Sequence, residues 1–261
     1  MGGVRPDPRL PIGVFDSGVG GLTVLKALRE ALPLEDFLYF GDTARVPYGQ
    51  KPLGMVRRFA WEIAGFLLRE GVKAIVVACN TASSAALPEL AEALSVPVFG
   101  VLEPAAEEAR AYARVGLIGT TATVESRAYE RFVPLAWARA CPLFVPLVEE
   151  GLWNDPVALL VARHYLEDAP EDLEALILGC THYPFLKDTL RQVLPGVRLI
   201  DSAQATARKV ASALQAQGLL NPAGSGRTVH YVTGDTESYR VLAQRLGEEV
   251  EELRAVALSE L

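Results

Sequence analysis

The sequence is poor in cysteine and has no long apolar run. It contains three cysteines among 261 residues, and none of them belongs to a C-x-x-C pair. A disulfide scaffold and a four-cysteine zinc site are therefore disfavoured. No segment approaches the roughly 18 apolar residues that a membrane span needs, and the N-terminal residues 1–13 lack the apolar core of a signal peptide. These absences predict a cytoplasmic protein with reduced thiols.

Positive charge is also scarce, and it is never clustered. The formal net charge is −7, and no run of five or more Lys or Arg residues occurs. Nucleic acid and anionic membranes are therefore disfavoured as partners. An anionic substrate would have to be attracted by local groups in its site, against an unfavourable overall field.

Short apolar segments alternate with amphipathic ones along the whole chain. Half of the residues are hydrophobic, which is enough for one or two complete cores. An amphipathic pattern such as that of residues 55–71, closed by Gly71, predicts a helix. Strands that alternate with helices predict an α/β fold with mostly parallel sheets covered on both faces. The segments with the apolar, β-branched character of buried strands are 11–15, 36–40, 74–78, 97–101, 115–119, 142–146, 175–179, 197–201 and 229–233.

The second half of the sequence repeats a feature of the first. The stretches "AIVVACNTASSAA" (74–86) and "ALILGCTHYPFL" (175–186) are each an apolar strand that ends on a cysteine and continues into Asn or Thr. This repetition predicts two similar doubly wound α/β domains that face each other, joined near residues 100–105. We assign residues 1–98 and 207–261 to the first domain and residues 99–206 to the second.

The residues that directly follow the predicted strands are where a functional site is expected. Ligands of open α/β sheets bind at the carboxyl ends of the strands. The residues at these ends are polar, rich in carboxylates and include thiols, but they contain no lysine. They are Asp16, Ser17, Gly41, Asp42, Cys79, Asn80, Thr81, Gly119, Thr120, Thr121, Glu149, Cys180, Thr181, His182, Asp201 and Ser202.

A glycine-rich segment, "DSGVGGLTVL" (16–25), resembles a dinucleotide-binding loop only in part. Gly18 and Gly20 fit the G-x-G-x-x-G pattern, but Thr23 occupies the third position and no Walker lysine follows. Backbone N–H groups at such a helix start suit a carboxylate as well as a phosphate, and a plain tight turn is the alternative. Residues 41–51 indicate a fixed loop, of use in a site or simply at the surface.

The cysteines have two interpretations. A free cysteine often only fills a core, and we assign that role to Cys141, which we place at the beginning of the strand 142–146. Cys79 and Cys180 instead occupy equivalent positions between a strand and a helix N-terminus, which is expected to lower the pKa of a thiol.

Two facing thiols could serve three purposes. They could form a disulfide, which the compartment disfavours. They could bind a metal together with His182, although no ligand spacing in the sequence supports this. They could also act as a matched acid and base, with His182 orienting or deprotonating Cys180 and Asp16 doing the same for Cys79.

Seven ordered blocks along nearly the whole chain resemble the glutamate racemases of the cofactor-independent aspartate/glutamate racemase superfamily. The blocks are "IGVFDSGVGGLTVL", "YFGDTARVPYG", "VVACNTASS", "VGLIGTTATVES", "CPLFVPLVEEG", "LGCTHYPFL" and "VTGD". Aspartate racemases of the superfamily tend to have Glu after "GCT" and His after "CNTA". This chain has His182 and Ser83 there, which favours glutamate. Ala203 and the segment "KPLG" depart from the usual family pattern without touching a candidate catalytic residue.

The resemblance implies a site in the cleft between the domains and a role for each residue. Cys79 and Cys180 would act on opposite faces of the substrate Cα, Cys79 on D-glutamate and Cys180 on L-glutamate. Asp16, Glu149 and His182 would support the two thiols. The implied substrate contacts are Asp16, Ser17, Tyr48, Gly49, Asn80, Thr81, Thr120, Thr121, Thr181 and His182.

The resemblance further implies interconversion of L- and D-glutamate for peptidoglycan synthesis, without pyridoxal phosphate or metal, by an enzyme that forms homodimers. The missing lysine agrees with this, because pyridoxal phosphate is bound as a Schiff base on lysine. Three alternatives stay open: an aspartate racemase, a non-catalytic protein that binds an acidic amino acid, and a zinc hydrolase using Cys79, Cys180 and His182.

Overall fold

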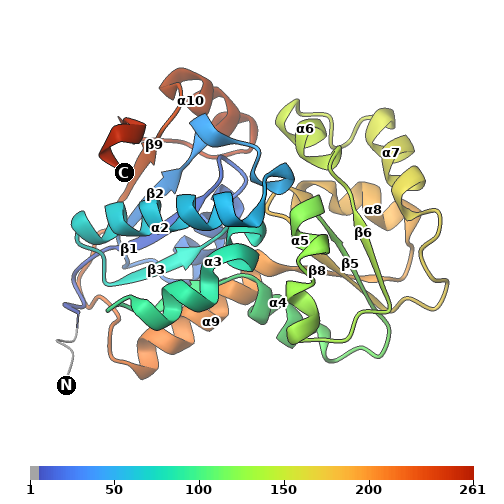
Figure 1. Cartoon of the computed structure of the whole chain (residues 1–261), viewed down its shortest axis with the longest axis horizontal. Coiled ribbons are helices and arrows are strands. Elements are labelled where there is room, and N and C mark those ends of the chain that lie inside the picture. The colour runs from blue at the N-terminus through green and yellow to red at the C-terminus, as the bar shows by residue number, and fades with distance from the viewer. Residues whose placement is uncertain (1–5) are drawn as a thin grey trace.

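The computed structural model describes residues 6–261, and these form an α/β fold with two sheets (Figure 1). The first five residues of the N-terminal stretch discussed above lie outside this range. Every strand pairing in both sheets is parallel. No helix among the described residues is long and apolar enough to cross a membrane.

The larger sheet has six strands in the order β10-β9-β2-β1-β3-β4. Its central strands are buried along their whole length, as their apolar sequences predict. The chain leaves this sheet after β4 and returns to it with β9 and β10. The strands are β1 (Ile12–Asp16), β2 (Phe37–Gly41), β3 (Ala74–Val77), β4 (Val98–Gly100), β9 (Thr228–Val232) and β10 (Glu252–Ala255).

The smaller sheet has four strands in the order β6-β5-β7-β8. Its two central strands, β5 and β7, are fully buried. The strands are β5 (Val115–Gly119), β6 (Trp137–Ala140), β7 (Ala175–Gly179) and β8 (Arg198–Asp201).

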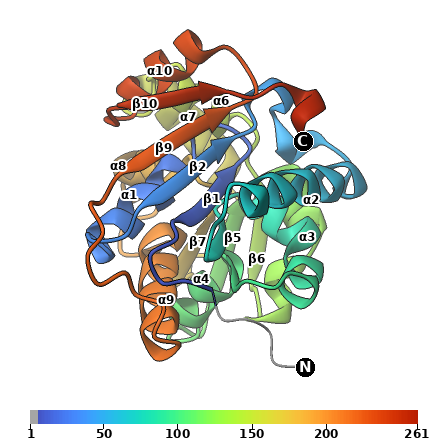
Figure 2. The ribbon, with the colours of Figure 1, turned by 90° about the vertical axis from the view of Figure 1, so that its left-hand side faces the viewer.

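Helices cover both faces of each sheet, which confirms the predicted fold class. Figure 2 shows α2 and α3 on one side of the larger sheet and α1 and α9 on the other. Helices α6, α7 and α8 pack on one face of the smaller sheet. The helices are α1 (Leu22–Ala31), α2 (Leu53–Arg69), α3 (Asn80–Ala93), α4 (Leu102–Ala109), α5 (Thr121–Glu125), α6 (Phe144–Glu149), α7 (Pro156–Leu166), α8 (Lys187–Val193), α9 (Ser202–Ala216) and α10 (Thr236–Arg245).

One hydrophobic core continues from the larger sheet into the smaller one. It joins Val14 of β1 and Leu25 of α1 to Leu117 of β5 and Ile177 of β7. Helices α4 and α9 contribute side chains to the same core, so the two halves share apolar contacts below the carboxyl ends of their strands.

One strand prediction was wrong and one strand was not predicted, and both concern sheet edges. Residues 142–146 do not form a strand, since the strand of this region is β6 (Trp137–Ala140) and α6 begins at Phe144. Prolines at 142 and 146 lack the N–H group that a sheet ladder needs, while β6 is partly exposed and gives only a weak apolar signal. Strand β10 in the C-terminal tail was not predicted, and it pairs with β9 at one edge of the larger sheet.

The helix expected at 55–71 is α2, and Gly71 follows it with a positive φ of 82°. The boundary expected between residues 98 and 99 falls inside β4, and the one between 206 and 207 falls inside α9. The division of the chain into a first domain (1–98 and 207–261) and a second domain (99–206) therefore stays a proposal. In it, the larger sheet belongs to the first domain and the smaller sheet to the second.

Candidate active site

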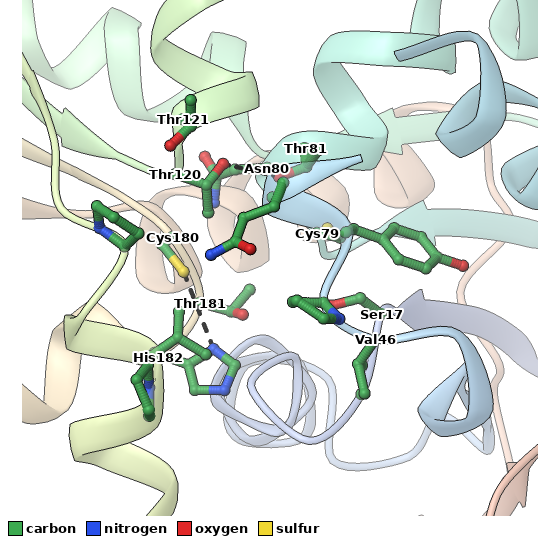
Figure 3. Close-up of a pocket in the computed structure, with 18 of the residues that line it drawn as sticks. Ser17, Val46, Cys79, Asn80, Thr81, Thr120, Thr121, Cys180, Thr181 and His182 are labelled. Atoms are coloured by element: carbon green, nitrogen blue, oxygen red, sulfur yellow. Dashed lines mark hydrogen bonds between the residues drawn. The ribbon is translucent and has the colours of Figure 1, made fainter. Parts of the chain in front are cut away.

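A cavity of about 380 Å³ opens where the carboxyl ends of the two sheets meet (Figure 3). It is lined by residues that follow β1 and β3 in the larger sheet and β5 and β7 in the smaller one. Parallel strands place their carboxyl ends at one sheet edge, so residues far apart in the chain converge here. The candidate residues that line this cavity are Ser17, Tyr48, Gly49, Cys79, Asn80, Thr81, Thr120, Thr121, Glu149, Cys180, Thr181 and His182.

Further lining residues were not expected from the sequence. They come from the turn after β1, from the loop after β2, and from the segment after β6 that continues into α6, and most of them are apolar. A proline in a segment that follows a strand was the available signal for the regions after β2 and β6. The additional residues are Gly18, Val46, Pro47, Gln50, Pro142, Leu143, Val145 and Pro146.

Four polar residues at strand ends do not line the cavity, namely Asp16, Asp42, Asp201 and Ser202. The Asp42 carboxylate is buried and accepts hydrogen bonds from Tyr48 Oη, from Arg45 Nε at 2.7 Å and from Thr233 Oγ1 at 2.8 Å. Asp201 caps α9, and Ser202 lies in the first turn of that helix. The Tyr48 hydroxyl is thus directed at Asp42, which anchors the loop carrying Tyr48 and Gly49.

Cys79 caps the N-terminus of α3, and its side chain is almost fully buried. Its Sγ accepts a hydrogen bond from the Ala82 N–H at 3.4 Å. Burial, and then the nearby Asp16 carboxylate, nevertheless raise the pKa of Cys79 to about 12. The expectation that the helix start would lower this pKa was wrong, because the loss of solvation outweighs the backbone hydrogen bond.

Cys180 follows β7 on the opposite side of the cavity from Cys79 (Figure 3). Its Sγ lies 3.9 Å from His182 Nδ1, and His182 Nε2 lies 3.0 Å from Glu149 Oε1. Burial alone would lower the pKa of His182, but the hydrogen bonds with Cys180 and Glu149 raise it to about 10. A His182 ring that is already doubly protonated at neutral pH donates to Cys180 and does not remove its proton.

Asp16 lies behind the cavity wall and is fully buried. Its Oδ2 accepts the Gly18 N–H at 2.9 Å, while Oδ1 has no protein partner. Burial raises the pKa of Asp16, although the charge of His182 and the backbone N–H groups oppose the shift. Asp16 does not line the cavity, and its nearby carboxylate contributes to the raised pKa of Cys79.

The glycine-rich segment allows the two halves of the protein to approach closely. A Cβ on Gly20 would lie 2.3 Å from Thr181 Oγ1 and 2.5 Å from His182 Nδ1. A Cβ on Gly21 would lie 2.4 Å from Asp16 Cβ. All three separations are far below van der Waals contact, so a side chain at either position would displace residues of the site.

A polar wall of amide and hydroxyl groups joins the first turn of α3 to the start of α5. Thr81 Oγ1 lies 3.0 Å from Thr120 Oγ1, and Thr120 caps α5 through the Thr123 N–H. Asn80 Oδ1 accepts a hydrogen bond of 2.5 Å from the Tyr129 hydroxyl. These groups offer donors to an anionic ligand.

Cys141 was misplaced at a strand beginning, for it directly follows the end of β6. It is fully buried, its N–H donates to Gly119 O at 2.9 Å, and its carbonyl accepts from Tyr183 Oη. All three cysteines are free thiols. Within residues 6–261, no group of three or more His, Cys, Asp or Glu side chains is arranged to hold a metal ion.

Known proteins share this architecture and sequence. The family model of Asp/Glu/hydantoin racemases matches residues 12–210. A glutamate racemase of Thermus thermophilus is 79% identical over 255 residues, which cover 98% of this chain and 99% of that protein.

Two solved structures extend the comparison. A crystal structure of glutamate racemase from Thermus thermophilus in complex with β-chloro-D-alanine superposes with a TM-score of 0.97 at 79% identity, covering 98% of this chain and 100% of that one. Glutamate racemase from Francisella tularensis in complex with D-glutamate superposes with a TM-score of 0.91 at 38% identity, covering 97% and 100%.

Proposed function

The chain belongs to the Asp/Glu/hydantoin racemase family and is an amino-acid racemase, and from this premise we propose that it interconverts L- and D-glutamate by proton transfer between two cysteines. The observation that supports the proposal most directly is the pair of buried thiols on opposite sides of one cavity, Cys79 after β3 and Cys180 after β7. Inversion of a stereocentre needs a base on one face of Cα and an acid on the other.

The reaction is balanced within the site. From D-glutamate, the Cys79 thiolate removes the α-proton from one face and the Cys180 thiol delivers its proton to the other face. The products are L-glutamate, a Cys79 thiol and a Cys180 thiolate, which is the starting state for the reverse reaction. Positioned proton transfer of this kind contributes about 10²- to 10⁴-fold in rate.

The two thiols lie in different electrostatic surroundings. The raised pKa of Cys79 keeps it a neutral thiol at neutral pH. The protonated His182 ring faces Cys180 at 3.9 Å and places a positive charge beside that sulfur.

The carbanion that forms at Cα has to be stabilised by the protein. The α-carboxylate takes up its charge, and donors aimed at this group stabilise the transition state more than the ground state. Asn80, Thr81 and Thr181 are the proposed donors near the two cysteines, with Ser17, Thr120, Thr121 and the segment Tyr48–Gly49 completing the substrate contacts. Asp16, Glu149 and His182 tune the thiols. No lysine occurs among the described lining residues, which agrees with a route that does not need pyridoxal phosphate. The proposed route needs no metal either.

The family also supports a proposed cellular role. D-Glutamate is a precursor of peptidoglycan, so the enzyme would supply cell-wall synthesis from the cytoplasm, and we propose that it acts as a homodimer. The two-domain division at 98/99 and 206/207 belongs to the same proposal, with the cleft between the domains admitting glutamate.

Proton NMR in deuterium oxide tests the function. Purified protein is incubated with L-glutamate, and separately with L-aspartate, in the presence of a chelator and without pyridoxal phosphate. We expect loss of the Cα proton signal together with decay of optical activity for glutamate only. Exchange of aspartate alone would assign the other substrate. Binding of glutamate without exchange would indicate a non-catalytic protein, and activity that the chelator abolishes would indicate a metal enzyme.

A further inference from the structure

A buried tyrosine outside the cavity lining joins the two halves of the site. Tyr129 lies in the short helix Ala128–Arg131, which follows α5, and it is fully buried. Its hydroxyl donates to Asn80 Oδ1 across 49 positions of sequence. A Cβ on Gly179, the residue before Cys180, would lie 3.5 Å from Tyr129 Cε2. Tyr129 therefore contacts the residue that follows one cysteine and packs beside the residue that precedes the other.

The hydrogen bond determines how the Asn80 amide is turned. Its length of 2.5 Å lies at the short end of the range for O–H···O bonds and below the range of about 2.7–3.2 Å for N–H···O bonds. The carbonyl oxygen of the amide thus faces Tyr129, and the Nδ2 group is directed elsewhere. Burial raises the pKa of Tyr129, so the hydroxyl keeps its proton and remains a donor throughout the working pH range.

The other end of the amide has no partner within the protein. Asn80 Nδ2 is buried and makes no hydrogen bond, although Asn80 lines the cavity. A buried donor without an acceptor costs about 1–3 kcal/mol, so a ligand acceptor is expected to satisfy it. In glutamate only the carboxylates can accept, because the ammonium group is a donor. Asn80 directly follows Cys79, which places its amide beside Cα and the α-carboxylate.

We propose that Tyr129 is a positioning residue for racemisation: its hydroxyl holds the Asn80 amide with Nδ2 turned toward the α-carboxylate of the substrate. This inference rests on the proposed function. Without the Tyr129 hydroxyl the amide loses its fixed orientation, and its donor no longer meets the charge that develops on the carboxylate. The loss falls on the transition state more than on substrate binding.

The variant Tyr129→Phe tests the inference against a matched control. Tyr239→Phe removes a hydroxyl that is equally buried but bonds His230 Nδ1 at 3.0 Å, outside the cavity lining. Both variants lose one buried hydrogen bond, so similar decreases in melting temperature are expected. For Tyr129→Phe we expect kcat to fall about 10-fold or more while KM changes less than about 3-fold. Tyr239→Phe should stay within about 2-fold of the wild type in kcat.

A double-mutant cycle shows whether Tyr129 acts through Asn80. In the Asn80→Ala background, Tyr129→Phe should cause no further loss of α-proton exchange, because the amide it positions is gone. Full additivity of the two losses, or a kcat of Tyr129→Phe equal to that of the Tyr239→Phe control, would overturn the inference. Absence of glutamate exchange in the wild type would instead overturn the proposed function, so the two failures are distinguishable.

Discussion

At the scale of single residues, the two cysteines are chemically alike but sit in opposite electrostatic surroundings. Cys79 is buried next to the Asp16 carboxylate, whereas Cys180 faces the protonated His182 ring. Their equivalent positions were readable from the sequence, since each follows an apolar strand. The difference between them was not, because burial and neighbouring charges come from residues distant in the chain.

We predict that Cys79→Ser and Cys180→Ser each lower racemisation by at least about 10²-fold in both directions, because a hydroxyl is a far weaker base than a thiolate. Circular dichroism at a wavelength where glutamate absorbs follows both directions, and calorimetry should show that glutamate still binds. Cys141→Ala is the control, for it alters a buried cysteine outside the cavity and should retain activity. Near-wild-type rates in either serine variant would rule out the two-base scheme.

The charge on His182 can be measured directly. We expect its imidazole to titrate near 10, and the midpoint to fall in Glu149→Gln because the charged partner of Nε2 is removed. His230, whose pKa burial and then Arg29 and Arg240 lower to about 4, should be unaffected by that change. Proton NMR of the ring protons provides both midpoints, with the His182 signal assigned by its loss in His182→Gln.

The same shift has a consequence for stability. In the unfolded chain a histidine titrates near 6.5, so protonated His182 stabilises the fold fully below about pH 6.5. Between pH 6.5 and about 10 the folded state holds a proton that the unfolded state has released. This contribution to stability therefore declines as the pH rises through this range, and it is lost above about 10. The difference in the free energy of unfolding between the wild type and His182→Gln, measured by urea unfolding, should therefore decrease from pH 6 to pH 10. A constant difference would contradict the raised pKa.

At the scale of structural elements, sequence patterns identified the buried strands and missed the elements at the sheet edges. Strands β5 and β7 are continuously apolar and were placed correctly, whereas β6 and β10 are partly exposed and carry charged or small residues. Because of the error at β6, the segment that follows it into α6 was not recognised, and Leu143 and Val145 of that segment line the cavity. An edge strand depends on one neighbour only, so its own sequence shows little of the pairing.

The turn between β1 and α1 leads to a prediction about an element that the sequence only partly explained. Gly20→Ala should destabilise the fold by about 1–3 kcal/mol and lower kcat, because its Cβ would overlap Thr181 and His182. Gly65→Ala in the middle of α2 is the control, since the nearest atom to its Cβ is Arg69 Nη1 at 3.6 Å. This change should stabilise by up to about 1 kcal/mol.

Chemical denaturation and steady-state kinetics on both glycine variants would distinguish the effect of steric overlap at Gly20 from the effect of helix propensity at Gly65. If Gly20→Ala kept its stability and its kcat, the close approach of this turn to the segment after β7 would not be needed for the site.

At the scale of the whole molecule, the candidate active site and a buried ion pair lie at opposite ends of the larger sheet. The carboxyl ends of its strands carry the site, while a buried ion pair lies before β2 and β3 at the amino ends. Lys73 pairs with Glu35, both are buried, and Lys73 Nζ also donates to Pro8 O at 2.6 Å. Glu35 Oε1 accepts the Asn221 N–H at 2.7 Å. The pair thus ties four chain segments together, a connection that no local sequence pattern indicates.

We predict that Lys73→Met and Glu35→Gln each destabilise the protein by about 3–5 kcal/mol, because each leaves a buried group without its partner. The double variant should cost less than the sum of the two, since it removes both members of the pair. Because the pair lies at the far end of the sheet, kcat and KM measured well below the melting temperature should match the wild type. Urea unfolding and racemisation assays on the three variants test this separation. A kcat that fell together with stability in all of them would instead mean that the amino end of the sheet controls the geometry of the two cysteines.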